Sequence, residues 1–149
     1  MSLQKEIMIK LKEAMKAKDS VALESLRAVK SAILLAQTET GAKEELTEDQ
    51  ELKILQKLVK QRKDSAVLFS EQGREDLAAP ELEQAAVIAQ FLPAQMTEEA
   101  IEAAVVEIIS QTGATGMKDM GKVMGMSSKQ LAGKADGKTI ANIVKKLLA

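Results

Sequence analysis

Aromatic side chains are almost absent from this chain: Phe69 and Phe91 are its only two, and Tyr and Trp do not occur. Strands favour aromatic and β-branched residues, whereas helices favour the Ala, Leu, Lys, Glu, Gln and Met residues that are plentiful here. Gly (8) and Pro (2), which interrupt helices, are few among 149 residues. The composition predicts an all-α fold and argues against a surface that stacks bases on tyrosine or tryptophan rings.

The chain also contains no Cys and no His. This excludes disulfides, thiolate nucleophiles, zinc sites built from Cys and His, and Ser-His-Asp triads. Asp and Glu are abundant, but no metal-ligand pattern stands out, so we identify no catalytic residue, metal or cofactor. No apolar run approaches the roughly 20 residues of a membrane-spanning helix, and the amphipathic N-terminus does not read as a secretory signal. We expect a cytoplasmic location and no membrane partner.

Apolar residues recur every three or four positions through the first 93 residues, as on one face of a helix. Helices are expected over about residues 2–18, 21–38, 48–72 and 76–92. Thr47 and Gln50 match a capping box before the third helix, and Gly73 is expected to end it. Pro80 suits the fourth helix only if that helix starts near Ala79. Its apolar stripe is expected to consist of Leu82, Ala85, Ile88, Ala89 and Leu92.

Arg62 falls within the apolar repeat of the third expected helix. In one interpretation it lies at the edge of the seam, where its stem covers apolar surface and its head reaches water. In the other, its guanidinium is partly buried and paired to a carboxylate. The residues alone leave both interpretations open.

The composition changes after Pro93. Six of the eight glycines lie between Gly113 and Gly137, and four of the eight methionines lie between Met117 and Met126. Helices are expected over about residues 97–112, 118–124 and 136–148, with Asp136 as the N-cap of the last and the methionines as core filler. We predict two domains, residues 1–93 with about four helices in hairpins and residues 94–149 with three helices.

Charge is distributed unevenly along the chain. The net charge is -2 over residues 1–92, -4 over residues 93–116 and +5 over residues 117–149. A balanced chain with one basic end indicates a localised anion-binding face rather than a generally cationic protein. Ordinary solvated surface lysines are the alternative.

The glycine-rich part of this basic end is the candidate site. Glycine exposes the backbone and permits close approach by a helix or a phosphate backbone, while lysines and a helix N-terminus attract anions. Gly121 and Gly125 are four apart, as are Lys118 and Lys122, so each pair is expected to share a face. The candidate residues are Lys118, Gly121, Lys122, Gly125, Lys134, Gly137 and Lys138. Caps and turns of a small helical domain are the plainer explanation.

These residues belong to a set of motifs that resembles the bacterial YqeY family. The motifs are QRKDS at 61–65, FLPAQM at 91–96, TGATGMKDMGKVMG at 112–125, GKADGK at 133–138 and IVKKLL at 143–148. The C-terminal half of that family is similar to the tail domain of the B subunit of the tRNA-dependent amidotransferase. The resemblance implies an all-α protein of two domains with a small three-helix tail.

The resemblance also implies a link to tRNA, because the tail domain of the amidotransferase grips tRNA while catalysis lies in other domains. We therefore expect a non-catalytic tRNA-binding accessory protein whose C-terminal domain holds the RNA. A tRNA-aminoacylation or amidation enzyme is a further expected partner. Two alternatives remain: an amidotransferase-like subunit that uses glutamine as amide donor only within a complex, and a helical adaptor that binds other proteins.

Overall fold

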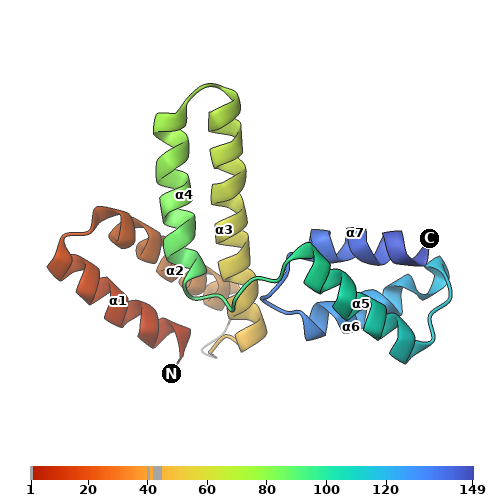
Figure 1. Cartoon of the computed structure of the whole chain (residues 1–149). Helices are drawn as coiled ribbons and strands as arrows, with labels where there is room; N and C mark the ends of the chain where they lie inside the picture. The colour runs from red at the N-terminus through yellow and green to blue at the C-terminus, as the bar shows by residue number, and fades with distance from the viewer. Residues whose placement is uncertain (1, 40, 42–44) are drawn as a thin grey trace. The chain divides into compact units, whose positions relative to one another are not determined.

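The computed structural model describes residues 2–39, 41 and 45–149, and it contains helices but no strand over these residues (Figure 1). The predicted all-α class is therefore confirmed. The helices are α1 (Leu3–Ala17), α2 (Ser20–Glu39), α3 (Glu48–Glu71), α4 (Glu75–Ala89), α5 (Glu98–Thr112), the 3₁₀ turn η1 (Met117–Asp119), α6 (Met120–Gln130) and α7 (Gly137–Leu148). None of the helices over these residues is both long and apolar enough to cross a membrane.

The chain forms two compact units, Met1–Leu92 and Pro93–Ala149. The first contains α1 to α4, and the second contains α5, η1, α6 and α7. Each unit has its own cluster of buried apolar side chains. Whether the two units fold independently remains a prediction.

Local capping signals in the sequence define several helix ends. The Thr47 hydroxyl accepts a hydrogen bond from the Gln50 N–H at 3.3 Å, and the Gln50 side chain accepts one from the Thr47 N–H at 2.9 Å. This confirms the predicted capping box. Gly73 follows α3 with φ 72°, in the left-handed region that favours glycine, so the predicted stop is confirmed. Gly113 ends α5 in the same way with φ 68°.

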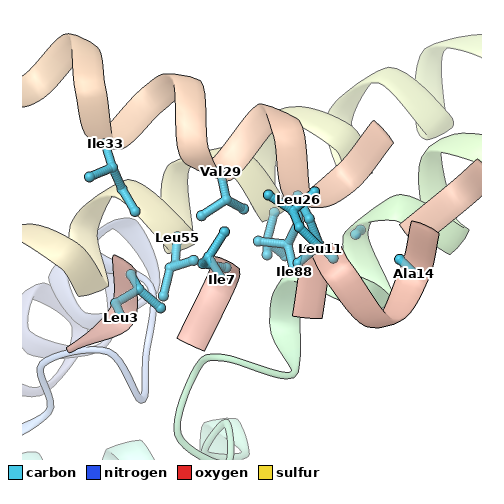
Figure 2. Packing of buried hydrophobic residues seen from close by; sticks show 11 residues of the cluster. Leu3, Ile7, Leu11, Ala14, Leu26, Val29, Ile33, Leu55 and Ile88 are labelled. Atoms are coloured by element: carbon cyan, nitrogen blue, oxygen red, sulfur yellow. The ribbon is translucent and has the colours of Figure 1, made fainter. Parts of the chain in front are cut away.

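The core of the first unit is built where the apolar seams of four helices meet. Figure 2 shows the α1 side chains Leu3, Ile7 and Leu11 directed toward side chains of α2, α3 and α4. The buried cluster consists of Leu3, Ile7, Leu11, Ala14, Leu26, Val29, Ile33, Leu55, Val59, Ala85 and Ile88. Full burial of one Leu or Ile side chain contributes about 1.5–3 kcal/mol, so these seams hold the helices together.

Helices α3 and α4 run side by side as a hairpin (Figure 1). The half-buried Arg62 links them: its Nε donates to Gln84 Oε1 at 3.1 Å, and its Nη1 donates to the Leu58 carbonyl at 3.3 Å. The second interpretation is right that the guanidinium is partly buried but wrong about a carboxylate partner, because the guanidinium bonds a neutral amide and a backbone carbonyl. The seam-edge interpretation also missed this link between the helices.

For α4 the expected start is confirmed, whereas part of the expected apolar stripe is wrong. The helix begins at Glu75, one residue before the expected start, so Pro80 lies inside it and a start near Ala79 does not occur. Ala78, upstream of the proline, is only 1% exposed, so the first turns of α4 are packed as part of the unit. Leu82, placed in the apolar stripe, is 50% exposed, because the buried face of α4 runs through Ala78, Ala85 and Ile88.

The second unit packs α5, α6 and α7 around one core. Its buried side chains are Ile101, Val105, Ile108, Val123, Leu131, Ala135, Ile140, Val144 and Leu148. The segment before α5 is fixed to the turn before α7, because the Met96 N–H donates to the Lys134 carbonyl and Gln95 Nε2 donates to the Gly133 carbonyl. The predicted helix over 118–124 differs in extent: η1 occupies 117–119, and α6 continues to Gln130.

Candidate nucleic-acid interface

The predicted site residues occupy three successive elements of the second unit. Lys118 lies in η1, and Gly121, Lys122 and Gly125 lie in α6. Lys134 lies in the turn that follows α6, and Gly137 and Lys138 begin α7. All seven residues are exposed.

The site residues fall into two groups at opposite ends of α6. Its 11 residues span about 16 Å at the usual helical rise. Lys118, Gly121 and Lys122 lie at its start, whereas Lys134 and Lys138 follow its end. A ligand that contacts both groups must therefore be long enough to follow the helix, as a nucleic-acid backbone is.

The glycines of α6 have no explanation within the fold. Gly121 is the second residue of α6 and Gly125 lies inside the helix, and a Cβ added at either position would meet no atom within 4 Å beyond the nearby backbone of α6 itself. Neither has a positive φ. A helix-interior glycine costs about 0.5–1 kcal/mol relative to alanine. The exposed face of α6 is therefore less stable than it could be, and its backbone is open to approach from outside.

Lys129 shares this exposed face of α6, and sequence analysis did not single it out. It lies seven residues after Lys122 and four after Gly125, spacings that place all three on one side of a helix. All three are exposed, whereas Val123 and Ser127 face the core. The seven-residue spacing between the lysines is the signal that could have identified it.

The acidic groups near the lysines are engaged locally. Asp119 Oδ2 accepts a hydrogen bond from the Thr115 N–H at 3.0 Å, and Asp136 Oδ2 accepts one from the Thr139 hydroxyl at 3.5 Å. Over residues 93–149, all of which the structure describes, no lysine forms an ion pair. The positive charge of residues 117–149 is therefore free to act on an external anion.

Helix α7 begins directly after Asp136, as predicted, but the aspartate side chain does not form the expected capping hydrogen bond. Asp136 occupies the N-cap with extended backbone (φ -71°, ψ 136°), but its side chain caps no backbone N–H. The first N–H groups of a helix have no acceptor within it and attract anions. Gly137 and Lys138 carry the first of these groups, and Lys138 adds an ammonium.

The methionines of this region fill the core only in part. Met120 and Met124 are partly buried against the core cluster, as expected. Met117 and Met126 are 44% and 38% exposed, so the expectation of core filler is wrong for these two. Their side chains lie on the surface near the lysines in sequence and add flexible apolar area there.

Acidic clusters do not form a metal centre in the part of the chain that the structure describes. No group of three or more Asp or Glu side chains is arranged to hold a metal ion there. The exposed face of α6 and the start of α7 instead combine ammonium groups with open backbone, a combination that suits polyanions.

Comparison with known proteins agrees with the sequence motifs. The model of the family described as Yqey-like protein matches residues 4–148. A protein of Clavispora lusitaniae named "Altered inheritance of mitochondria protein 41, mitochondrial" is 36% identical over 101 residues. The alignment covers 66% of this chain and 58% of that relative, so the chain spans little more than half the relative's length.

Proposed function

This chain belongs to the YqeY family, and from that premise we propose that it is a non-catalytic accessory protein that binds tRNA through residues 93–149. The observation that carries the proposal is the exposed face of α6. There, two glycines that the fold does not require alternate with lysines that form no ion pair within the described part of the chain. The resemblance of the second unit to the tRNA-gripping tail of the amidotransferase supports tRNA as the ligand.

The chemistry of this face favours recognition of phosphates over recognition of bases. Lysine is a mobile point charge that supplies affinity without sequence information. Glycine lets the sugar–phosphate backbone approach the helix closely, since no Cβ stands in the way. Neither Phe69 nor Phe91 lies in this unit, so base stacking on aromatic rings contributes nothing here.

The location and partners follow from the same proposal. An accessory protein of this kind acts where tRNA is charged or amidated, and we propose the cytoplasm for this chain. The relative from Clavispora lusitaniae is named as a mitochondrial protein, and we do not transfer that location to this chain. An aminoacylation or amidation enzyme is the further partner that we propose.

The test is a titration of the full chain with tRNA at several salt concentrations. The interface variant carries Lys118→Ala, Lys122→Ala, Lys134→Ala and Lys138→Ala. Removing one lysine–phosphate interaction lowers the magnitude of the slope of log K against log salt by about 0.9 for duplex nucleic acid. We expect this variant to show weaker affinity and weaker salt dependence, with an unchanged helical circular dichroism spectrum.

The matched control is the α1 variant, with four lysines of the first unit replaced. It carries Lys5→Ala, Lys12→Ala and Lys16→Ala in α1 and, beside them in α2, Lys30→Ala. The two variants remove the same formal charge, so diffuse attraction lowers their affinities equally, whereas a localised site responds only to the interface variant. If tRNA affinity falls equally in the two variants, the proposed site is wrong. If the parent chain does not bind tRNA, the proposed function is wrong.

A further inference from the structure

Helix α1 has a second face that the core does not use. Met8, Ile9 and Met15 are 39%, 47% and 54% exposed, although apolar side chains of this size stabilise a fold mainly when buried. They alternate with lysines at helical spacing, three, four or seven residues apart. The outer face of α1 consists of Lys5, Met8, Ile9, Lys12, Met15 and Lys16.

This face borders an open groove between α1 and α2. Met8 and Ile9 line the groove, which has a volume of about 760 Å³, and Lys5 and Lys30 lie along it. Lys30 belongs to α2 and is partly buried, so its stem covers part of the groove while its ammonium adds charge. Among the described residues that line the groove, Glu45 is the one acidic residue.

Charge is segregated between the flanks of α1. Lys10 Nζ pairs with Glu13 Oε2 at 2.9 Å, and the hydrogen bond and charge of Glu13 raise the pKa of Lys10. Glu6, four residues before Lys10, lies on the same flank. On the outer face and groove, by contrast, no ion pair involves Lys5, Lys12, Lys16 or Lys30 among residues 2–39, 41 and 45–149. These lysines are therefore free to attract a negatively charged partner.

We propose that this groove and the outer face of α1 dock an acidic amphipathic helix of a partner protein. The apolar side chains receive the partner's apolar stripe, and the lysines along the groove meet its carboxylates. The flexible side chains of Met8 and Met15 adapt to the shape of the partner. The 15 residues of α1 span about 22 Å, which a partner helix of about four turns matches.

The groove and the lysines along it favour this occupant over three others. A bilayer is flat and does not fill a groove between two helices. A second copy of the chain would bring the outer lysines of α1 against their own counterparts. RNA gains nothing from Met8 and Ile9, because these side chains neither stack on bases nor bind phosphate.

The experiment titrates the isotope-labelled full chain with a synthetic peptide and follows amide signals by NMR. The probe is a helical peptide of about 16 residues with leucines on one face and glutamates on its flanks, and its counterpart has lysines in place of the glutamates. We expect the acidic peptide to shift signals of α1 and α2 and the basic counterpart to shift none. Equal binding of both peptides, or no binding of the acidic one up to about 1 mM, overturns the proposal.

Paired variants separate the groove from other exposed apolar surface. Met8→Glu with Ile9→Glu is expected to weaken binding of the acidic peptide at least about tenfold. The matched control is Val67→Glu with Leu68→Glu, two α3 residues that are 57% and 58% exposed. We expect this control to bind as the parent does, and an equal decrease in the two pairs overturns the proposal.

Two further measurements test the other occupants and the charge. The α1 variant keeps the apolar residues, and we expect it to bind the acidic peptide more weakly and with less salt dependence. The parent chain is also mixed with phosphatidylcholine vesicles with and without phosphatidylserine, and its mass in solution is measured. Vesicle binding that Met8→Glu with Ile9→Glu removes, or dimerisation that it removes, assigns the face to another occupant and overturns the proposal.

Discussion

The outer faces of α1 and α6 carry similar charge but differ in what lies between the lysines. On α1 the lysines alternate with Met8, Ile9 and Met15, which offer apolar area. On α6 they alternate with Gly121 and Gly125, which offer open backbone. The difference indicates that charge alone does not identify a ligand: bulky apolar neighbours suit a protein helix, whereas glycine neighbours suit a phosphate backbone.

A second contrast separates a basic side chain that is hydrogen-bonded within the fold from basic side chains that form no ion pair within the part of the chain that the structure describes. Arg62 is half-buried and donates two hydrogen bonds, one of them across the α3–α4 hairpin. The ammonium groups of the lysines in residues 93–149 form no ion pair among the residues described there. Substitution of Arg62 is therefore expected to change the free energy of unfolding, whereas substitution of the lysines is expected to change the affinity for a ligand.

The largest expected effect concerns the glycines of α6. Gly121→Ala with Gly125→Ala is expected to stabilise the protein by about 1 kcal/mol, mostly through Gly125 inside the helix, because alanine favours the helix and meets no atom beyond the helix backbone. The same pair should weaken tRNA binding about tenfold, since two methyl groups keep the phosphate backbone away. Urea unfolding and tRNA titration measure the two effects.

The control for this pair is Gly73→Ala. Gly73 has φ 72°, a conformation that strains alanine, so the control should destabilise the protein by about 1 kcal/mol and leave tRNA binding unchanged. If the α6 pair stabilises the protein and tRNA affinity stays unchanged, the backbone of α6 is not where RNA approaches.

Arg62→Ala is expected to cost about 1–2 kcal/mol, because the substitution removes two hydrogen bonds from a charged donor. The matched control is Lys57→Ala in the same helix, at an exposed residue, with an expected change within about 0.5 kcal/mol. Chemical unfolding measures both. If both substitutions change the free energy of unfolding by the same small amount, the hydrogen bonds of Arg62 do not stabilise the fold.

The smallest expected effect concerns Glu51 in the first unit. Burial raises the pKa of its carboxyl, and the nearby charges of Glu48 and Glu45 raise it further. A carboxyl with a raised pKa in the folded state contributes stability below its unfolded pKa, and this stability disappears as pH rises through the folded pKa. Glu51→Gln should therefore reduce the pH dependence of stability, with a change within about 0.5 kcal/mol. Urea unfolding midpoints at pH 4 and pH 7 test this; an unchanged pH dependence would contradict it.

Helix class and most helix ends could be predicted from local signals. The capping box at Thr47 and the glycines Gly73 and Gly113 act within a few residues of the chain, so their effects are visible in sequence. Lys18 was different: α1 ends on it with φ 55°, a conformation that glycine usually supplies. The turn into α2 requires this conformation there, and the residue type does not signal it.

Features that depend on packing between helices could not be predicted in the same way. The buried face of α4 extends upstream to Ala78, which the expected apolar stripe did not include. Arg62 finds Gln84, 22 positions away, and no local pattern pairs them. The sequence places Leu82 in the buried stripe of α4, because the short helix has apolar residues on more than one face and spacing alone does not show which face is buried.

For the candidate site, the sequence identified the candidate residues but not how they are arranged in space. The lysines and glycines were identified from composition and spacing, but their distribution over two ends of α6 depends on where η1 and α6 begin and end. Lys129 was missed because it lies outside the glycine motifs. The exposed apolar residues of α1 were missed because one buried seam already explained that helix.

The most direct test of the central claim measures two ligands against two variants. The full parent chain, the interface variant and the α1 variant are each titrated with tRNA and with the acidic helical peptide under one salt condition. The account predicts that the interface variant binds tRNA more weakly and the peptide as the parent does, whereas the α1 variant binds the peptide more weakly and tRNA as the parent does. Equal weakening of both ligands in both variants would contradict it, because the two lysine faces would then act only through their shared charge.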